Sequence, residues 1–384
     1  MTIENGLVLE RLEHLKRVME ADVAARRYWG GVIIVARNGR PGLSATVGTE
    51  DGEGKRPLRG DSVFSIFSVT KAFTNILSLR AIELGRFALT TKVSEVIPEF
   101  GGGVRSNITV FHLLTHTSGL PMVWVPKPGM NIDRLDLIIA AICENIQSAE
   151  PPGERVAYSP ICNQALLGEM LRRTDPKGRS YRDIAREDLF EPLQMHDTAI
   201  GRRADLKSRH VVPDMRGNVG ITHPSSNNSL PNGAFEDEKA EMPWVGAVCT
   251  VPNLFRFAEM LRRGGELDGA RILSPTILAM ARKNWTGDKP NELYKALAVK
   301  RGWEPSPGYI GLGFSLRGTA ICHHQFGTLT SPETFGNYGA GSALYWVDPA
   351  LNMTFVCLTA GVMESNDNIE RFQRLGDIAV SAAV

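Results

Sequence analysis

Apolar residues at the start of the chain follow first helical and then strand-like spacing. Residues 6–28 place an apolar side chain at about every third or fourth position, which predicts an amphipathic helix. The continuous apolar run after this helix predicts a buried strand, a turn at Asn38-Gly39 and a second strand through 44–48. Residues 68–84 then predict a helix with an apolar face.

The middle of the chain, from about residue 86 to 300, has a different pattern. Most of it predicts helical segments joined by long loops, for example helices at 138–146 and 163–173. Residues 210–243 are rich in Pro, Asn, Ser and Gly and poor in apolar side chains, which predicts a long surface loop. Loops of that length in a compact domain are often functional.

The end of the chain returns to strand composition. Strands are predicted at 309–316, 343–347 and 353–359, and a last helix is predicted at 368–383. The predicted order is therefore helix, hairpin, long helical insert, antiparallel strands and helix.

Composition and charge exclude several classes of protein. The 384 residues are 43% hydrophobic and 22% charged, which argues against a disordered or membrane-spanning chain. Lysine and arginine total 43 against 42 acidic residues, so the charge gives no reason to expect nucleic acid or an anionic membrane as a partner. The five cysteines are scattered, without a C-x-x-C motif, and no secretory signal is evident. We therefore expect reduced thiols and a cytoplasmic location.

The tetrapeptide Ser68-Val69-Thr70-Lys71 opens the helix predicted at 68–84. A serine and a lysine three positions apart share a helix face, so the lysine can reach the serine hydroxyl. A buried lysine with a lowered pKa can take the proton whose loss makes serine a nucleophile. The helix N-terminus also supplies a backbone N–H for a developing oxyanion. By itself the S-x-x-K spacing is a weak signal, because chance also places it on surface helices.

Two further segments carry groups that such chemistry needs. Tyr158 lies in a predicted loop, where a tyrosinate beside Lys71 can serve as the base for Ser68. In that interpretation Lys71 holds the pKa of Tyr158 down. The glycine-rich run at 335–342 precedes a strand, and a backbone N–H there can complete an oxyanion hole.

Five motifs occur in order along most of the chain: Phe67–Lys71, Leu113–Leu120, Pro152–Ser159, Leu189–Met195 and Phe335–Pro349. Together they resemble the serine β-lactamase and penicillin-binding superfamily. The branch that they resemble holds class C β-lactamases, DD-peptidases and, closest to this chain, family VIII carboxylesterases. The resemblance implies an α+β, β-lactamase-like fold, with an antiparallel sheet flanked by helices and an inserted helical region.

The resemblance also implies a division of the chain. Residues 1–85 and 300–384 would form the sheet domain, and 86–299 would form a mainly helical insert with long loops. The active site would lie between these two parts. This arrangement agrees with the order of elements that the hydrophobic pattern predicts.

The catalytic roles that the resemblance implies fall on four residues. Ser68 would be the acylated nucleophile, Lys71 its partner, and Tyr158 the general base and acid. The backbone N–H groups of Ser68 and Ala340 would form the oxyanion hole. Because the acylating base is disputed in this superfamily, the proton is assigned to the Tyr158–Lys71 pair jointly. No cofactor and no metal are expected.

Substrate contacts are expected from Asn337, Tyr338, Gly339 and Trp124. Trp124, Met122 and Trp244 are interpreted either as walls of an acyl pocket or as ordinary core side chains. Two residues depart from the lactamase-like pattern. Pro160 stands where that pattern has an asparagine, and Asn337 stands where lactamases and peptidases have lysine or histidine. A neutral amide cannot form an ion pair with a substrate carboxylate. Both departures favour an ester or acyl donor over a β-lactam.

Other chemical signals are weaker. His112 and His116 share the spacing of two metal ligands on a helix, but Leu113 stands where a zincin needs glutamate. His116 is expected instead to bond a backbone group near the turn at 118–119. Cys322-His323-His324 lacks partners at useful spacing and is interpreted as a loop near the site. No G-x-S-x-G motif is present, which argues against an α/β-hydrolase.

The predicted function is a serine hydrolase that cleaves ester bonds of small molecules through a Ser68 acyl-enzyme. The main alternative is an acyltransferase that passes the same acyl group to a small metabolite. β-Lactamase or D-amino-acid peptidase activity is less favoured, and a non-catalytic binding protein on this fold is a further alternative. The expected partner is a small ester or acyl donor, with neither nucleic acid nor membrane.

Overall fold

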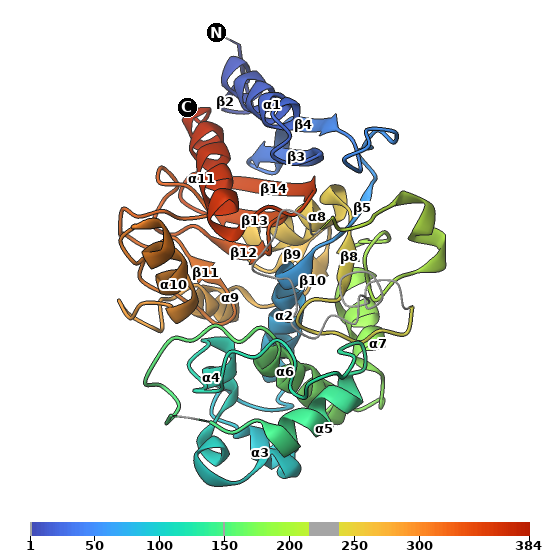
Figure 1. The fold of residues 1–384 in the computed structure, drawn as a ribbon, viewed down its shortest axis with the longest axis vertical. Helices are drawn as coiled ribbons and strands as arrows, with labels where there is room; N and C mark the ends of the chain where they lie inside the picture. Colours follow the sequence, from blue (N-terminus) through green and yellow to red (C-terminus); the bar gives the residue numbers. More distant parts are fainter. Residues whose placement is uncertain (1, 149, 215–237) are drawn as a thin grey trace.

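The computed structural model describes residues 2–148, 150–214 and 238–384, and an antiparallel sheet lies at its centre (Figure 1). The sheet has six strands in the order β11-β12-β13-β14-β3-β4. Their bounds are β11 Ser315–Leu316, β12 Phe335–Gly339, β13 Ala343–Asp348, β14 Met353–Ala360, β3 Gly30–Arg37 and β4 Arg40–Gly48. The C-terminal β14 pairs with the N-terminal β3, so the two ends of the chain build one sheet.

Helices cover both faces of this sheet, and the burial of the strands follows from that. Helices α1 (Leu9–Ala24) and α11 (Ser365–Ser381) pack on one face, and α8 (Val251–Arg262) packs on the other (Figure 1). Strand β3 is buried along nearly all of its length because it has helices on both sides. The edge strand β4 alternates between buried and exposed positions.

A smaller sheet brings distant segments to the start of helix α2 (Thr70–Glu83). Its strand order is β6-β8-β5-β7, with β5 parallel to β7 and the other pairs antiparallel. The bounds are β5 Val63–Ser65, β6 Ala199–Ile200, β7 His210–Val211 and β8 Ala247–Cys249. Helix α2 is buried almost throughout, and it runs from this sheet into the helical part of the molecule (Figure 1).

The remaining helices lie mostly beyond the sheets, and the other elements are short. The helices are α3 Val93–Val96, α4 Val110–Leu114, α5 Leu135–Asn145, α6 Cys162–Arg173, α7 Tyr181–Ala185, α9 Pro275–Ala281 and α10 Glu292–Arg301. The 3₁₀ and π segments are η1 Phe67–Val69, η2 Pro98–Phe100, η3 Gly103–Asn107, η4 Arg186–Phe190 and η5 Ala204–Arg209. Two small hairpins pair β1 (Ile3–Glu4) with β2 (Leu7–Val8) and β9 (Glu266–Leu267) with β10 (Ala270–Arg271). Across the three described ranges, no helix has the length and apolar character to cross a bilayer.

The predicted element order is confirmed, with local exceptions. The strand predicted at 309–316 is wrong for most of its length, because Gly313 has a φ of +87° that breaks an extended backbone, and only Ser315–Leu316 pairs as a strand. In the loop predicted at 210–243, His210 and Val211 instead form the buried strand β7, while 215–237 lie outside the described residues. The division at 86–299 stays a prediction, although α8 from that range packs on the six-stranded sheet.

Candidate active site

Ser68 lies where an extended strand turns abruptly into a buried helix. The chain leaves β5 at Ser65 and passes through Phe67, whose φ of +47° is unusual for a residue with a bulky side chain. Ser68 then sits in the short 3₁₀ segment η1 (Phe67–Val69), which continues directly into α2. The serine is therefore held at the N-terminal end of a rigid element, where backbone N–H groups are not consumed by the helix.

Lys71, one helical turn after Ser68, is the buried amine of the site. Its side chain is only 3% exposed, and its Nζ lies 3.2 Å from the Ser68 Oγ. The same nitrogen donates to the backbone carbonyl oxygens of Pro160 and Trp244, each at 2.9 Å. No carboxylate in the described parts of the chain forms an ion pair with it, and burial lowers the pKa of Lys71 to about 7.

These three contacts determine what the lysine can do. Carbonyl oxygens only accept hydrogen bonds, so Pro160 and Trp244 take two N–H groups of Lys71. A neutral amine has two N–H groups and one lone pair, so the lone pair is left for the third contact. That contact is the Ser68 hydroxyl. The arrangement therefore places a neutral Lys71 to accept the serine proton.

Tyr158 approaches Ser68 from the loop before α6. Its hydroxyl donates to the Ser68 Oγ at 2.7 Å, and the Lys71 Nζ lies 5.1 Å from the centre of its ring. Burial raises the pKa of Tyr158 to about 12. The expectation that Lys71 lowers this pKa is therefore wrong, because desolvation of the phenolate is the largest influence. Tyr158 is a neutral hydrogen-bond donor at ordinary pH.

His116 packs against the Tyr158 ring and binds the backbone on both sides of this tyrosine. It follows α4 in a left-handed conformation with φ of +55°, and its Nδ1 accepts from the backbone N–H of Ser159 at 3.1 Å. Its ring lies 5.1 Å from the Tyr158 ring at an interplanar angle of 30°, and its carbonyl accepts from the Ala157 N–H at 2.9 Å. Burial lowers the pKa of His116 to about 3, so the ring stays neutral and able to accept. The bond expected near residues 118–119 is replaced by these bonds to the tyrosine segment.

His112 has a local structural role. Its Nδ1 accepts from the Thr109 backbone N–H at 3.1 Å and completes a capping box at the start of α4. His116 lies beyond the end of that helix, so the two histidines do not share a helix face. Among the residues that the structure describes, no group of three or more His, Cys, Asp or Glu side chains is arranged to hold a metal ion.

Strand β12 also borders the site, since Asn337 and Tyr338 line the same cavity as Ser68. A Cβ at Gly339 would lie 2.4 Å from the carbonyl oxygen of Ile66, so only glycine allows the strand this close to the Ser68 turn. Ala340 follows at the end of the strand. The Asn337 side chain is bound at both ends, since its Nδ2 donates to the Gly313 carbonyl at 3.1 Å and its Oδ1 accepts from the Tyr345 hydroxyl at 2.7 Å.

These groups open into one hollow, called here the Ser68 cavity, with a volume of about 260 Å³. Its lining includes most of the residues predicted for the site: Ser68, Lys71, Tyr158, Ala340, Asn337, Tyr338 and Trp124. Gly339 is buried and is not in this lining, and its backbone lies close to the carbonyl group of Ile66. Met122 does not line the cavity, and Trp244 contributes its carbonyl oxygen to Lys71. The lining does not include the Cys322–His324 loop, which was expected near the site.

Several lining residues were missed by the sequence reasoning: Asn75, His116, Leu293, Tyr294, Leu297 and Ile369. Asn75 had a signal, because it is a polar residue one turn after Lys71 in an otherwise apolar part of the helix. Its Nδ2 donates to the Gly313 carbonyl at 2.9 Å. No motif pointed to Tyr294 or Leu297, because α10 joins the cavity only through the tertiary fold.

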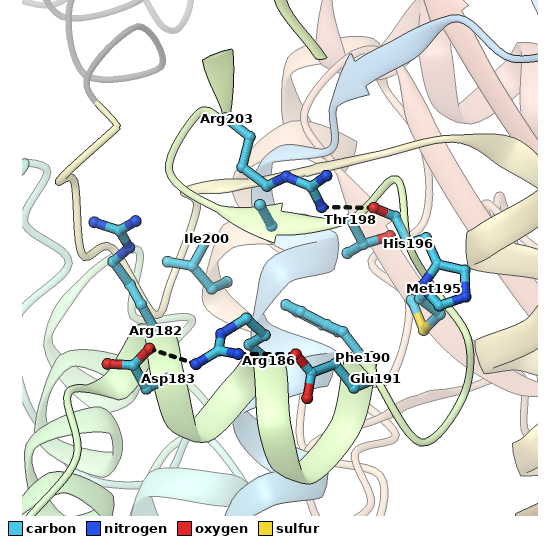
Figure 2. A pocket seen from close by; sticks show the side chains of 11 residues that line it. Arg182, Asp183, Arg186, Phe190, Glu191, Met195, His196, Thr198, Ile200 and Arg203 are labelled. Carbon is cyan, nitrogen blue, oxygen red and sulfur yellow. Dashed lines mark hydrogen bonds and ion pairs between the residues drawn. The ribbon is translucent and has the colours of Figure 1, made fainter. Parts of the chain in front are cut away.

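A second hollow, called the Arg186 hollow, has a volume of about 220 Å³ and shares none of its described lining residues with the Ser68 cavity (Figure 2). Arg186 donates to Asp183 at 3.0 Å and to Glu191 at 2.8 Å, and Arg203 donates to the His196 carbonyl at 2.6 Å. Arg186 and Arg203 are thus bound by neighbours, and the described lining of the hollow contains no serine, lysine or tyrosine.

The fold and the Ser68 cavity together define a class: an α+β protein whose serine hydroxyl lies between a buried lysine and a tyrosine. The family model described as Beta-lactamase matches residues 15–379, and the chain belongs to the Beta-lactamase family. The resemblance drawn from the sequence motifs is confirmed.

Individual relatives agree with this assignment. Esterase EstB from Burkholderia gladioli is 37% identical over 374 residues, which cover 90% of this chain and 89% of that protein. Penicillin-binding protein 4 from Amycolatopsis lactamdurans is 29% identical over 261 residues, and the match spans 65% of the length of each chain. The crystal structure of a family VIII carboxylesterase superposes with a TM-score of 0.78 at 20% identity and covers 100% of both chains. This likeness confirms the predicted α+β fold.

Proposed function

We propose that the protein is a serine hydrolase that cleaves carboxylic esters of small molecules through an acyl-enzyme at Ser68. The observation that carries the proposal is the arrangement around the Ser68 Oγ, with Lys71 at 3.2 Å and Tyr158 at 2.7 Å. The nucleophile and its proton acceptor are within hydrogen-bond reach, as covalent catalysis requires. The similarity to Esterase EstB supports an ester as the substrate.

In the acylation step, the Ser68 Oγ attacks the ester carbonyl while the amine of Lys71 takes the serine proton. The backbone N–H groups of Ser68 and Ala340 hold the oxyanion of the tetrahedral intermediate. When the C–O bond to the leaving group breaks, the Tyr158 hydroxyl protonates the departing alkoxide, and the Lys71 ammonium returns a proton to the tyrosinate. The products are a free alcohol and an acylated Ser68.

Deacylation reverses this proton path with water as the nucleophile. Water attacks the acyl carbonyl and gives its proton to the Lys71–Tyr158 pair. The Ser68 oxygen regains a proton from this pair as the acid leaves. An alcohol in place of water would give acyl transfer by the same steps, so the acyltransferase alternative remains a prediction. Added small alcohols distinguish the two outcomes, because acyl transfer converts part of the product from acid into a new ester.

The surroundings of Asn337 support an ester rather than an anionic β-lactam. The side chain is neutral, and it is bound by Gly313 and Tyr345. It offers no cation for a substrate carboxylate next to the proposed oxyanion hole. Negligible turnover of a chromogenic cephalosporin is the corresponding expectation.

Intact-mass spectrometry after brief mixing with p-nitrophenyl butyrate tests the proposal. Wild type should gain the mass of one butyryl group and release nitrophenol, and Ser68→Ala should show no adduct and lose turnover by about 10³-fold or more. Ser118→Ala is a matched control, because Ser118 is a buried serine that bonds Asn163 instead of Lys71. An adduct on Ser68→Ala, or turnover that this substitution leaves unchanged, would refute the proposal.

A further inference from the structure

The Ser68 cavity is lined by three phenols, and they differ in how their hydroxyl groups are bound. The Tyr158 hydroxyl donates to Ser68 at 2.7 Å. The Tyr338 hydroxyl accepts from the Asn368 side chain at 2.7 Å and from the Gly341 N–H at 3.3 Å. The Tyr294 hydroxyl makes no hydrogen bond to any residue in the described ranges.

The helix that carries Tyr294 is bonded at both of its ends. At the start of α10 (Glu292–Arg301), the Asn291 side chain accepts from the Leu293 N–H at 3.1 Å. At the other end, the Lys300 Nζ lies 3.3 Å from the Glu364 carboxylate at the start of α11. The helix that carries Tyr294 is therefore connected to a neighbouring element at its C-terminal end.

The Ser68 cavity has apolar and polar side chains around Tyr294, and the polar ones, among them Asn291, Lys300 and Glu364, form no hydrogen bond with its hydroxyl. Leu293, Leu297 and Ile369 line the same cavity and offer no side-chain hydrogen-bonding group. Burial, together with the nearby phenols of Tyr338 and Tyr158, raises the pKa of Tyr294 above its ordinary value. The hydroxyl is thus a neutral donor in a largely apolar setting. The side chain is partly buried, so water can occupy this hydrogen-bonding position until an acceptor on a ligand displaces it.

We infer that the Tyr294 hydroxyl binds the substrate itself, by donating a hydrogen bond to a second acceptor oxygen beyond the scissile ester. The inference rests on the proposed esterase function and deepens it by naming the substrate class. That class is an ester whose apolar chain carries an oxo or ether oxygen. The oxygen can belong to the acyl chain or to the alcohol, and the two sources are separated by experiment.

Two pairs of matched substrates test this inference. For the acyl chain, p-nitrophenyl levulinate differs from p-nitrophenyl pentanoate by one oxo group in place of a methylene. For the alcohol, ethoxyethyl butyrate differs from pentyl butyrate by one ether oxygen in place of a methylene. The measured quantity is the ratio of kcat/KM for the oxygen-bearing ester to that of its alkyl partner, in wild type and in Tyr294→Phe.

In one of the two pairs, Tyr294→Phe should lower this ratio roughly three- to tenfold, the range that corresponds to a neutral hydrogen bond. The pair that responds identifies the half of the ester that Tyr294 contacts. Tyr338→Phe is the matched control, because it removes a phenol hydroxyl from the same cavity that is already bound by Asn368 and Gly341. It should change both members of each pair by the same factor.

The inference is overturned if Tyr294→Phe leaves the ratio unchanged in both pairs, or if Tyr338→Phe lowers it equally. Both results assume that Ser68 is acylated by the alkyl esters. If wild type forms no adduct with p-nitrophenyl pentanoate, the proposed function fails and this inference fails with it. Adduct mass on the alkyl esters therefore separates the two failures. A melting temperature for each variant identifies any loss of ratio that comes from misfolding.

Discussion

The Ser68 cavity and the Arg186 hollow are similar in volume, at about 260 and 220 Å³. They differ in how their basic side chains are bound and in the direction in which the pKa of each is shifted. Arg186 is bound by the carboxylates of Asp183 and Glu191, which raise its pKa. Lys71 has a hydroxyl and two carbonyl oxygens around it, and burial lowers its pKa to about 7. Carboxylates hold a cation in its charged form, whereas burial without them releases the proton.

The comparison shows why a hollow with several charges need not be a catalytic site. In the Arg186 hollow, each hydrogen bond of Arg186 is made to a group that keeps the guanidinium protonated and in place. In the Ser68 cavity, the buried amine of Lys71 is bound by two carbonyl oxygens, and its third contact is the Ser68 hydroxyl. A perturbed pKa next to a nucleophile is typical of functional sites. Three predictions test this difference.

The largest effect is expected from Lys71→Met, which keeps an unbranched apolar side chain as far as the Cε position and removes the amine. Because Lys71 is the proposed acceptor of the serine proton at neutral pH, kcat/KM for p-nitrophenyl butyrate should fall by about 10²- to 10⁴-fold. The melting temperature should change only modestly, because the removal of a buried amine is opposed by the loss of its hydrogen bonds to the Pro160 and Trp244 carbonyl oxygens. Steady-state kinetics and thermal denaturation measure the two effects. More than about a tenth of the wild-type rate in Lys71→Met would refute the role of this amine.

A smaller effect is expected from pH. The pKa of Lys71 is lowered from 10.5 to about 7, so the amine is neutral above pH 7 and protonated below it. Only the neutral amine accepts a proton, so kcat/KM should fall about tenfold for each pH unit below 7 and reach a plateau above it. His116 has a pKa of about 3 and does not titrate in this range.

The high-pH side of the same profile separates the two candidate bases. If the Tyr158 phenolate were the base, kcat/KM would keep rising toward its pKa of about 12 instead of reaching a plateau near neutral pH. A profile of kcat/KM between pH 5 and pH 10, measured with an ester that is stable to alkali, distinguishes these results. A flat profile across pH 7 would contradict both assignments.

The smallest effect is expected in the Arg186 hollow. Arg186→Met removes a cation by the same substitution as Lys71→Met, but its side chain is 51% exposed and its ion pairs are screened by water. We expect kcat/KM to change less than about twofold and the free energy of unfolding to fall by less than about 1 kcal/mol. Steady-state kinetics and urea denaturation measure both. A loss of activity close to that of Lys71→Met would mean that the two hollows are coupled.

Part of the site was readable from the sequence because it is local. Ser68 and Lys71 are one helical turn apart, so their proximity needs nothing beyond the helix that the pattern predicts. Tyr158 was identified through a motif, although its contact with Ser68 spans ninety residues. Its pKa was predicted in the wrong direction, because the degree of burial depends on what packs around the ring.

By itself, the sequence determined the order of helices and strands, the glycine at 339 and the spacing that brings Lys71 next to Ser68. These features depend on spacing along the chain, on backbone freedom and on the period of apolar residues. Only the tertiary structure decided that the carbonyl groups of Pro160 and Trp244 surround Lys71, and that Tyr294 of α10 faces the cavity. The physical reason is that burial and long-range packing determine which groups are charged and which hydrogen-bonding groups have no partner within the described residues. A single segment of the sequence does not determine either property.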